Sequence, residues 1–270
     1  MLSVLPSASL LAQEPLQQPL EIVRRAVEMD RRDTEISRNY TYLQRQEQRE
    51  LDSDGKLKRT QSETFDITLL EGSPYRRQVA KDDHPLGPKE QRKEEEKLQH
   101  SIAERRKETK EQRERRIAEW TRRQEKQREP VKELPEAFEF KLRGEEPLNG
   151  GVAYVIDATP KPGYRPKSSA TAFFPKVKLR LWINKQDYQW VRMDLETLDT
   201  ISFGGVLVRM AKGSHLMVEN ARINQEVWLP KSAVLRGSVR IALVKMLRGE
   251  ISFTFSDYKK FQAESRLVTQ

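Results

Sequence analysis

Most of the chain alternates between hydrophobic and polar residues in runs that are separated by turn signals. Such runs occupy residues 39–51, 57–70, 75–80, 138–142, 152–159, 177–184, 188–198, 216–223, 227–229, 234–243 and 251–258. A period of two places alternate side chains on opposite faces of a strand, so each run predicts a strand with one buried face. Turn pairs such as Asp54-Gly55 and Asn149-Gly150 favour tight hairpins. The pattern therefore predicts a long antiparallel meander.

Two segments have the helical period instead. In residues 19–34 apolar residues recur at spacings of three and four, which predicts a helix. Residues 200–212 predict a second helix, and a strand of the core is the alternative. The apolar face of that helix would be formed by Phe203, Val206, Leu207 and Met210.

A charged block interrupts the meander. Residues 89–129 contain no Pro or Gly and consist mainly of Glu, Lys, Arg and Gln, which are strong helix formers. The apolar residues are too sparse for the stripe of a coiled coil. The block predicts a long solvated helix, or two helices that meet near Thr109, with an end at Pro130 and Pro135. Overall, 34% of the residues are charged and 36% are hydrophobic, so the core must be built from the segments that flank the block.

The block also contains dense clusters of basic residues. These are Arg105, Arg106, Lys107, Arg113, Arg115, Arg116, Arg122 and Arg123. A net charge of +9 attracts nucleic acid, anionic lipid or acidic proteins. Interleaved Glu residues cancel much of the local charge, and Trp120 alone is available for base stacking. We expect a solvated helix with internal ion pairs, or a docking face for an envelope protein partner or anionic membrane surface, and no nucleic acid.

The sequence contains no recognisable catalytic or metal-binding pattern. His84, His100 and His215 lack a carboxylate or second histidine at the spacing of metal ligands, and the chain has no cysteine. The motifs of zinc proteases, serine hydrolases and P-loop proteins are absent. We therefore expect a protein that is not an enzyme and that has no cofactor and no metal.

The first twelve residues, MLSVLPSASLLA, are apolar and small and precede a polar run. They are typical of the second half of a secretory signal with cleavage after Ala12, although the positive start of such a signal is missing. We expect an exported, periplasmic protein. The predicted organisation is a remnant signal peptide (1–12), a helix and first meander (13–85), a charged helical insertion (86–135), and the remaining strands of the same β-domain (136–270).

Several motifs resemble the outer-membrane lipoprotein-sorting family, the LolA/LolB-like fold. They are YTY at residue 40, LDSDGK at residue 51, GGVAYVIDATPK at residue 150, LRLWINKQDYQWVR at residue 179 and EVWLP at residue 226. The resemblance implies an α+β fold: a strongly curved antiparallel half-barrel with helices on its concave side. The charged helical insertion is a departure from the compact carriers of that family.

The resemblance also implies a function. A half-barrel of this kind encloses an apolar cavity, so we expect a carrier that binds a lipid or an acylated lipoprotein. Phe203, Val206, Leu207 and Met210 would then form a movable plug over the cavity. The same fold serves in sensor domains of the MucB/RseB type, so an envelope sensor that docks through its basic helix is the alternative.

Overall fold

The computed structural model describes residues 18–203, 208–241 and 245–261. The predicted signal peptide lies outside these residues. The helices are α1 (Pro19–Ser37), α2 (Pro88–Lys107), α3 (Lys110–Gln127) and α4 (Glu129–Ala137), with a short 3-10 turn, η1, at Phe174–Lys176. The strands are β1 (Tyr40–Leu51), β2 (Leu57–Leu70), β3 (Ser73–Lys81), β4 (His84–Pro85), β5 (Phe138–Leu148), β6 (Gly151–Pro160), β7 (Val177–Asn184), β8 (Trp190–Thr197), β9 (Ile201–Phe203), β10 (Val208–Met210), β11 (His215–Ile223), β12 (Val227–Ile241) and β13 (Lys245–Lys260).

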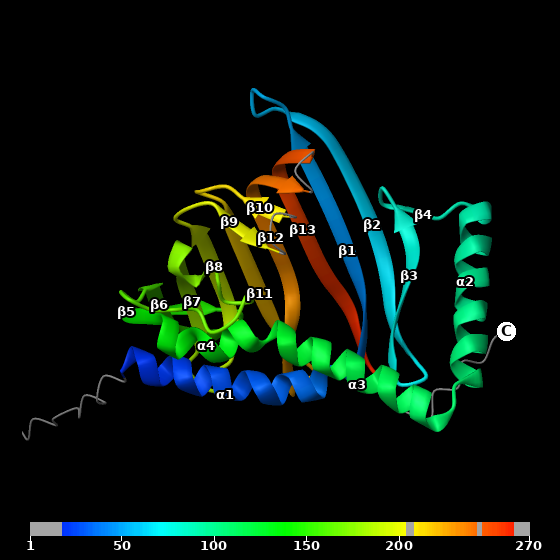
Figure 1. The fold of residues 1–270 in the computed structure, drawn as a ribbon, viewed down its shortest axis with the longest axis horizontal. Helices are drawn as coiled ribbons and strands as arrows, with labels where there is room; N and C mark the ends of the chain where they lie inside the picture. Colours follow the sequence, from blue (N-terminus) through cyan, green and yellow to red (C-terminus); the bar gives the residue numbers. More distant parts are fainter. Residues whose placement is uncertain (1–17, 204–207, 242–244, 262–270) are drawn as a thin grey trace, which may run out of the picture.

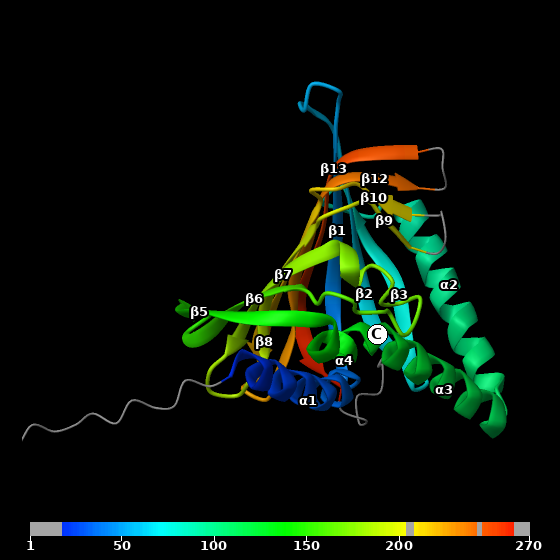
Figure 2. The ribbon, with the colours of Figure 1, turned by 60° about the vertical axis from the view of Figure 1, so that its left-hand side comes forward.

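The described strands form one open antiparallel sheet. Its order is β4-β3-β2-β1-β13-β12-β11-β8-β7-β6-β5, and the small hairpin β9–β10 joins it through β12. The sheet is strongly curved, since β5 and β6 run across the direction of β1 and β2 in Figure 2. Because β4 and β5 are the two edges, the helices between them connect opposite ends of the sheet (Figure 1). The predicted curved sheet with helices is confirmed.

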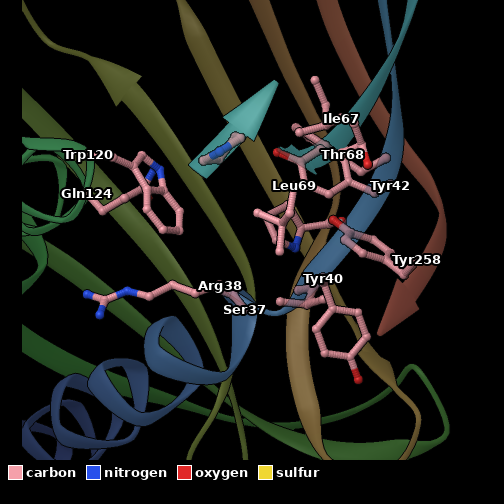
Figure 3. A pocket seen from close by; sticks show the side chains of 14 residues that line it. Ser37, Arg38, Tyr40, Tyr42, Ile67, Thr68, Leu69, Trp120, Gln124 and Tyr258 are labelled. Atoms are coloured by element: carbon pink, nitrogen blue, oxygen red, sulfur yellow. The ribbon is translucent and has the colours of Figure 1, made fainter. Parts of the chain in front are cut away.

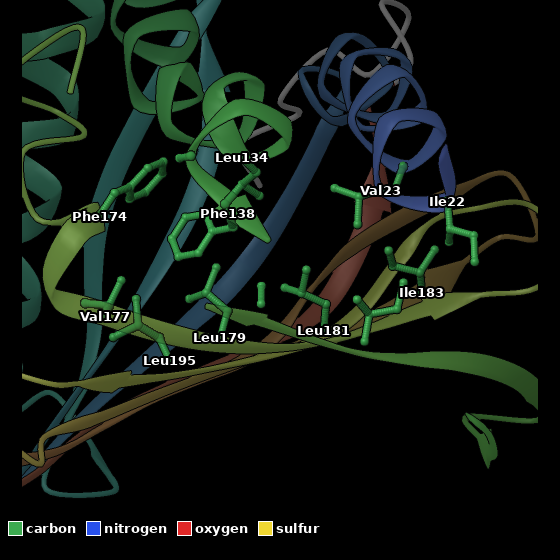
Figure 4. Packing of buried hydrophobic residues seen from close by; sticks show 14 of the residues in the cluster. Ile22, Val23, Leu134, Phe138, Phe174, Val177, Leu179, Leu181, Ile183 and Leu195 are labelled. Atoms are coloured by element: carbon green, nitrogen blue, oxygen red, sulfur yellow. The ribbon is translucent and has the colours of Figure 1, made fainter. Parts of the chain in front are cut away.

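The main core lies between the sheet and two helices on its concave side. Helix α1 buries Ile22, Val23 and Ala26, and α4 buries Leu134 and Ala137. They pack on strand residues that alternate along the sheet (Figure 4), among them Tyr154, Ile156, Val177, Leu179, Leu181 and Ile183. The predicted alternation holds at Lys178 and Arg180, which are exposed, whereas Trp182 on the same face is buried in a second apolar cluster.

The charged block forms two helices that break at Thr109, as one of the two predictions stated. The Thr109 hydroxyl accepts a hydrogen bond from the Gln112 backbone N–H (3.3 Å), and the Gln112 side chain accepts one from the Thr109 N–H (2.8 Å). This reciprocal pair is a capping box, and it starts a new helix. Helix α2 lies along the β3 edge and α3 turns back along the sheet (Figure 1).

Three sequence predictions were wrong in detail. Residues 201–203 and 208–210 are strands, the alternative to the predicted helix, because β10 pairs with both β9 and β12 and this pairing outweighs the helical period. The helical region does not end at Pro130 and Pro135, since Pro130 occupies the first turn of α4, where a missing N–H is tolerated, and Pro135 lies inside α4, which continues to Ala137. Strand β12 continues through Pro230, beside which Lys231 forms a bulge in β12 that shifts the register with β11.

Candidate ligand cavity

A cavity of about 190 Å³ lies between the curved sheet, the C-terminal end of α1 and helix α3. It is lined by strands β1, β2, β3, β12 and β13 and by side chains of the two helices (Figure 3). The lining residues are Ser37, Arg38, Tyr40, Tyr42, Ile67, Thr68, Leu69, Pro74, Trp120, Gln124, Leu229, Pro230, Phe255 and Tyr258. Most are apolar or aromatic, so the cavity suits an apolar ligand.

An aromatic cluster forms the sheet side of the cavity. The ring of Tyr42 lies 5.9 Å from that of Phe255 and 5.3 Å from that of Tyr258, measured between centroids. The Tyr258 hydroxyl donates a 2.6 Å hydrogen bond to the Pro230 carbonyl. Burial raises the pKa of both Tyr42 and Tyr258. These hydroxyls therefore stay neutral at physiological pH, and the wall presents aromatic faces without negative charge.

The strands place these side chains by simple alternation, except at one position. Tyr40 and Tyr42 share a face of β1, and Ile67 and Leu69 share a face of β2. Phe255 and Tyr258 are three residues apart, a spacing that would normally put them on opposite faces. The register between β1 and β13 shifts there, and Asp257 has a φ of +53°. This irregularity turns Tyr258 toward the same cavity as Phe255.

The helical side of the cavity is formed by α3 and by the end of α1. Trp120 and Gln124 are four residues apart and so lie on the same face of α3. Figure 3 shows both opposite the tyrosine cluster, with Arg38 extending from the end of α1 beneath them. Trp120 is half-buried. The insertion thus contributes its tryptophan as one wall of the cavity.

Helix α3 is held in this place by a connection to the β2–β3 turn. The Arg105 guanidinium donates to the carbonyls of Leu70 (2.6 Å) and Ser73 (3.0 Å). Arg116 donates to the Ser73 hydroxyl and to the Glu71 carbonyl, and it also pairs with Glu108. We call Arg105, Arg116 and the turn residues Leu70–Pro74 the elbow contact. It fixes the α2–α3 junction against the sheet.

The eight basic residues of the predicted docking face therefore fall into two groups, those with an ion pair or hydrogen bond to the fold and those without an ion pair. Arg105 and Arg116 belong to the elbow contact, Arg106 and Arg113 pair with Glu71, and Lys107 pairs with Glu104. The remaining three, Arg115, Arg122 and Arg123, are exposed and form no ion pair with any described residue. These three are the members of the predicted surface without an ion pair among the described residues, while Arg106 and Lys107 are paired but remain 73% and 75% exposed.

The predicted plug residues do not line the cavity as far as the structure describes them. Met210 is buried in the main core, beside Ile201. Phe203 ends β9, and Val206 and Leu207 lie outside the described residues. Sequence reasoning missed Arg38, Tyr42, Phe255 and Tyr258. The alternating aromatic pairs of β1 and β13 (residues 40 and 42, and 253 and 255) were the available signal.

Two further searches of the described residues were negative. None of them form a cluster of three or more His, Asp or Glu side chains that could hold a metal ion. Among the described helices, none combines the length and the hydropathy that crossing a membrane requires.

The chain is similar to several solved structures. One is an outer-membrane lipoprotein-sorting protein domain from Vibrio parahaemolyticus (10% identity, TM-score 0.37, covering 91% of this chain and 95% of that one). Another is a LolA superfamily protein from Nitrosomonas europaea (12% identity, TM-score 0.31, 93% and 97%). A third is the MucA/MucB complex of Pseudomonas aeruginosa (11% identity, TM-score 0.26, 91% and 99%). No protein-family model matches the chain, and no curated protein does. The likenesses are too distant to assign a function.

Proposed function

We propose that this protein is a periplasmic carrier that holds an acyl chain of a lipid or an acylated lipoprotein in the cavity beneath α3. The observation that carries the proposal is the aromatic cluster of Tyr42, Phe255 and Tyr258, which faces Trp120 across a cavity lined mostly by apolar and aromatic side chains. Each buried methylene of an acyl chain would contribute about 0.8 kcal/mol. No lining group is arranged as a nucleophile or a general base, so binding is the role that the site supports.

The size of the cavity limits what it can hold. At about 190 Å³ it is smaller than typical ligand pockets of ~300–1,000 Å³. It shares Pro230, Phe255 and Tyr258 with a shallower neighbouring hollow of about 450 Å³. We expect a single acyl chain to enter the cavity and to continue along this hollow.

The test is uptake of a fluorescent neutral acyl probe by the full chain. We expect saturable binding by the wild type and about tenfold weaker binding by Trp120→Ala, because the loss of one aromatic wall removes about 1–3 kcal/mol of apolar contact. Leu98→Ala is the matched control, since Leu98 is a half-buried apolar residue of α2 that does not line the cavity. Absence of probe binding by the wild type, or equal losses in both variants, would contradict the proposal.

A second candidate function is docking on an anionic membrane or an acidic envelope protein through α3. Arg115, Arg122 and Arg123 favour it, because they are exposed and form no ion pair with a described residue. Replacing all three by Gln should abolish sedimentation with phosphatidylglycerol vesicles at low salt, while acyl-probe uptake continues. Sedimentation that is unchanged in the triple variant would exclude this surface.

A further inference from the structure

Arg38 is the one charged residue among the described residues that line the cavity. It caps the C-terminal end of α1, where the helix dipole favours a cation. Arginine stays protonated even when it is partly buried. The Arg38 side chain is 29% exposed, so water reaches part of it, but the part at the wall of an apolar, aromatic cavity is costly to bury unless an anion meets it.

The structure does not supply a good partner for this guanidinium. The Nε atom of Arg38 is buried and has no hydrogen-bond partner among the described residues. The nearest carboxylate belongs to Glu125, at 4.0 Å from an Nη atom, and the Glu125 side chain is 61% exposed. This pair is at the limit of an ion pair and is open to solvent, so it contributes little. The Nε atom of Arg128, at the start of α4, is likewise buried without a partner, but the Arg128 guanidinium pairs closely with Asp30.

We propose that the ligand is a single acyl chain with an anionic end group, a carboxylate or a phosphate, which Arg38 binds at the wall of the cavity. This inference rests on the proposed function, because the same cavity holds the chain. The planar guanidinium presents a fork of N–H donors that matches the two oxygens of a carboxylate or phosphate. The acyl chain would extend from Arg38 toward the tyrosine cluster, and the exposed Glu125 would swing away into solvent.

The experiment measures displacement of the neutral fluorescent acyl probe from the full chain. The competitors are laurate, dodecyl phosphate and dodecanol, which share one chain length and differ in the end group. We expect the wild type to bind at least one of the anions about tenfold more tightly than dodecanol, the magnitude of a hydrogen bond to a charged group. In Arg38→Gln the ratio of the affinity for the anion to the affinity for dodecanol should fall to about one. The affinity for dodecanol itself should stay unchanged.

The matched control is Arg31→Gln, which removes one positive charge from the exposed face of the same helix. Arg31→Gln should keep the preference for the anions over dodecanol. This result would show that the preference depends on direct contact with Arg38 and not on the net charge of the protein. Arg38→Lys retains the charge and should keep part of the preference. Preference for laurate alone identifies a fatty acid, preference for dodecyl phosphate alone identifies a phosphate-bearing lipid, and either supports the inference.

Two outcomes would overturn the inference, and they differ in whether acyl binding itself stands. If the wild type binds dodecanol as tightly as both anions, the anionic end group is wrong while acyl binding stands, whatever the stability of the Arg38 variants. If neither the probe nor any competitor binds, the proposed function fails and the inference fails with it.

Discussion

The backbone N–H of Trp228 donates a 3.0 Å hydrogen bond to the carboxylate of Asp33, and this bond joins strand β12 to helix α1. Both residues are buried. The Trp228 indole N–H also donates to Asp187, in the β7–β8 turn, at 2.9 Å. Three segments that are distant in the sequence therefore meet at one tryptophan, which directly precedes Leu229 and Pro230 of the cavity in β12.

The Asp33 contact predicts a dependence of stability on pH. Burial raises the pKa of Asp33 to about 6, whereas an unfolded Asp titrates near ~3.9. Between about pH 4 and pH 6 the folded state binds the proton more tightly than the unfolded state. The free energy of unfolding should therefore fall as pH rises through this window, by at most about 2 kcal/mol after solvent screening, and then level off.

The variant Asp33→Asn should remove this slope, because the amide oxygen can still accept the Trp228 hydrogen bond without a charge. Urea unfolding at intervals from pH 4 to pH 8 measures it. At pH 8 the variant should be about 1–2 kcal/mol more stable than the wild type. Glu28→Gln, on the exposed face of the same helix, should leave the slope unchanged. A slope that persists in Asp33→Asn would assign the titration to another group.

Gly72 predicts a stability difference between two glycines of similar backbone conformation. Gly72 has a φ of +85° and Gly55 a φ of +79°, and alanine in this left-handed region costs about 1–2 kcal/mol. An added Cβ at Gly72 would lie 2.8 Å from the Cδ1 atom of Ile117, whereas one at Gly55 would meet nothing within 4 Å. Gly72→Ala should therefore destabilise the protein by about 1 kcal/mol more than Gly55→Ala does.

The excess should come from the contact between α3 and the β2–β3 turn. Ile117→Val removes the Cδ1 atom, so adding it to Gly72→Ala should recover part of the excess in a double-mutant cycle. Equal losses of stability in Gly72→Ala and Gly55→Ala, measured by urea unfolding, would show that the Ile117 side chain moves aside without a cost in free energy.

The elbow contact predicts that losing Arg105 destabilises the α2–α3 junction locally. Arg105→Gln should leave the carbonyls of Leu70 and Ser73 without their donor and destabilise the junction by about 1–3 kcal/mol. Hydrogen exchange of the α2–α3 junction should then become faster by about tenfold or more, while exchange in β7 and β8 stays unchanged. Arg115→Gln is the control, because Arg115 is exposed on α3. Equal exchange in both variants would show that Arg105 does not hold the junction.

The local pattern of hydrophobic and polar residues determined much of the secondary structure of this protein. Alternation predicted the bounds of β2 and β7 as the structure has them, because a strand with one buried face records its period in the sequence. Composition predicted the charged helices, and the residues at Thr109 and Gln112 contain the capping signal that separates them.

Only the tertiary structure decided which distant segments meet. Pairing of β1 with β13 brings Tyr42 beside Phe255, and the bulge at Asp257 adds Tyr258. The return of α3 along the sheet places Trp120 opposite them, and it turns Arg105 and Arg116 from candidate docking residues into anchors. These contacts depend on strand order and on chain reversal, which leave no periodic trace in the sequence, whereas the faces of individual strands and helices do.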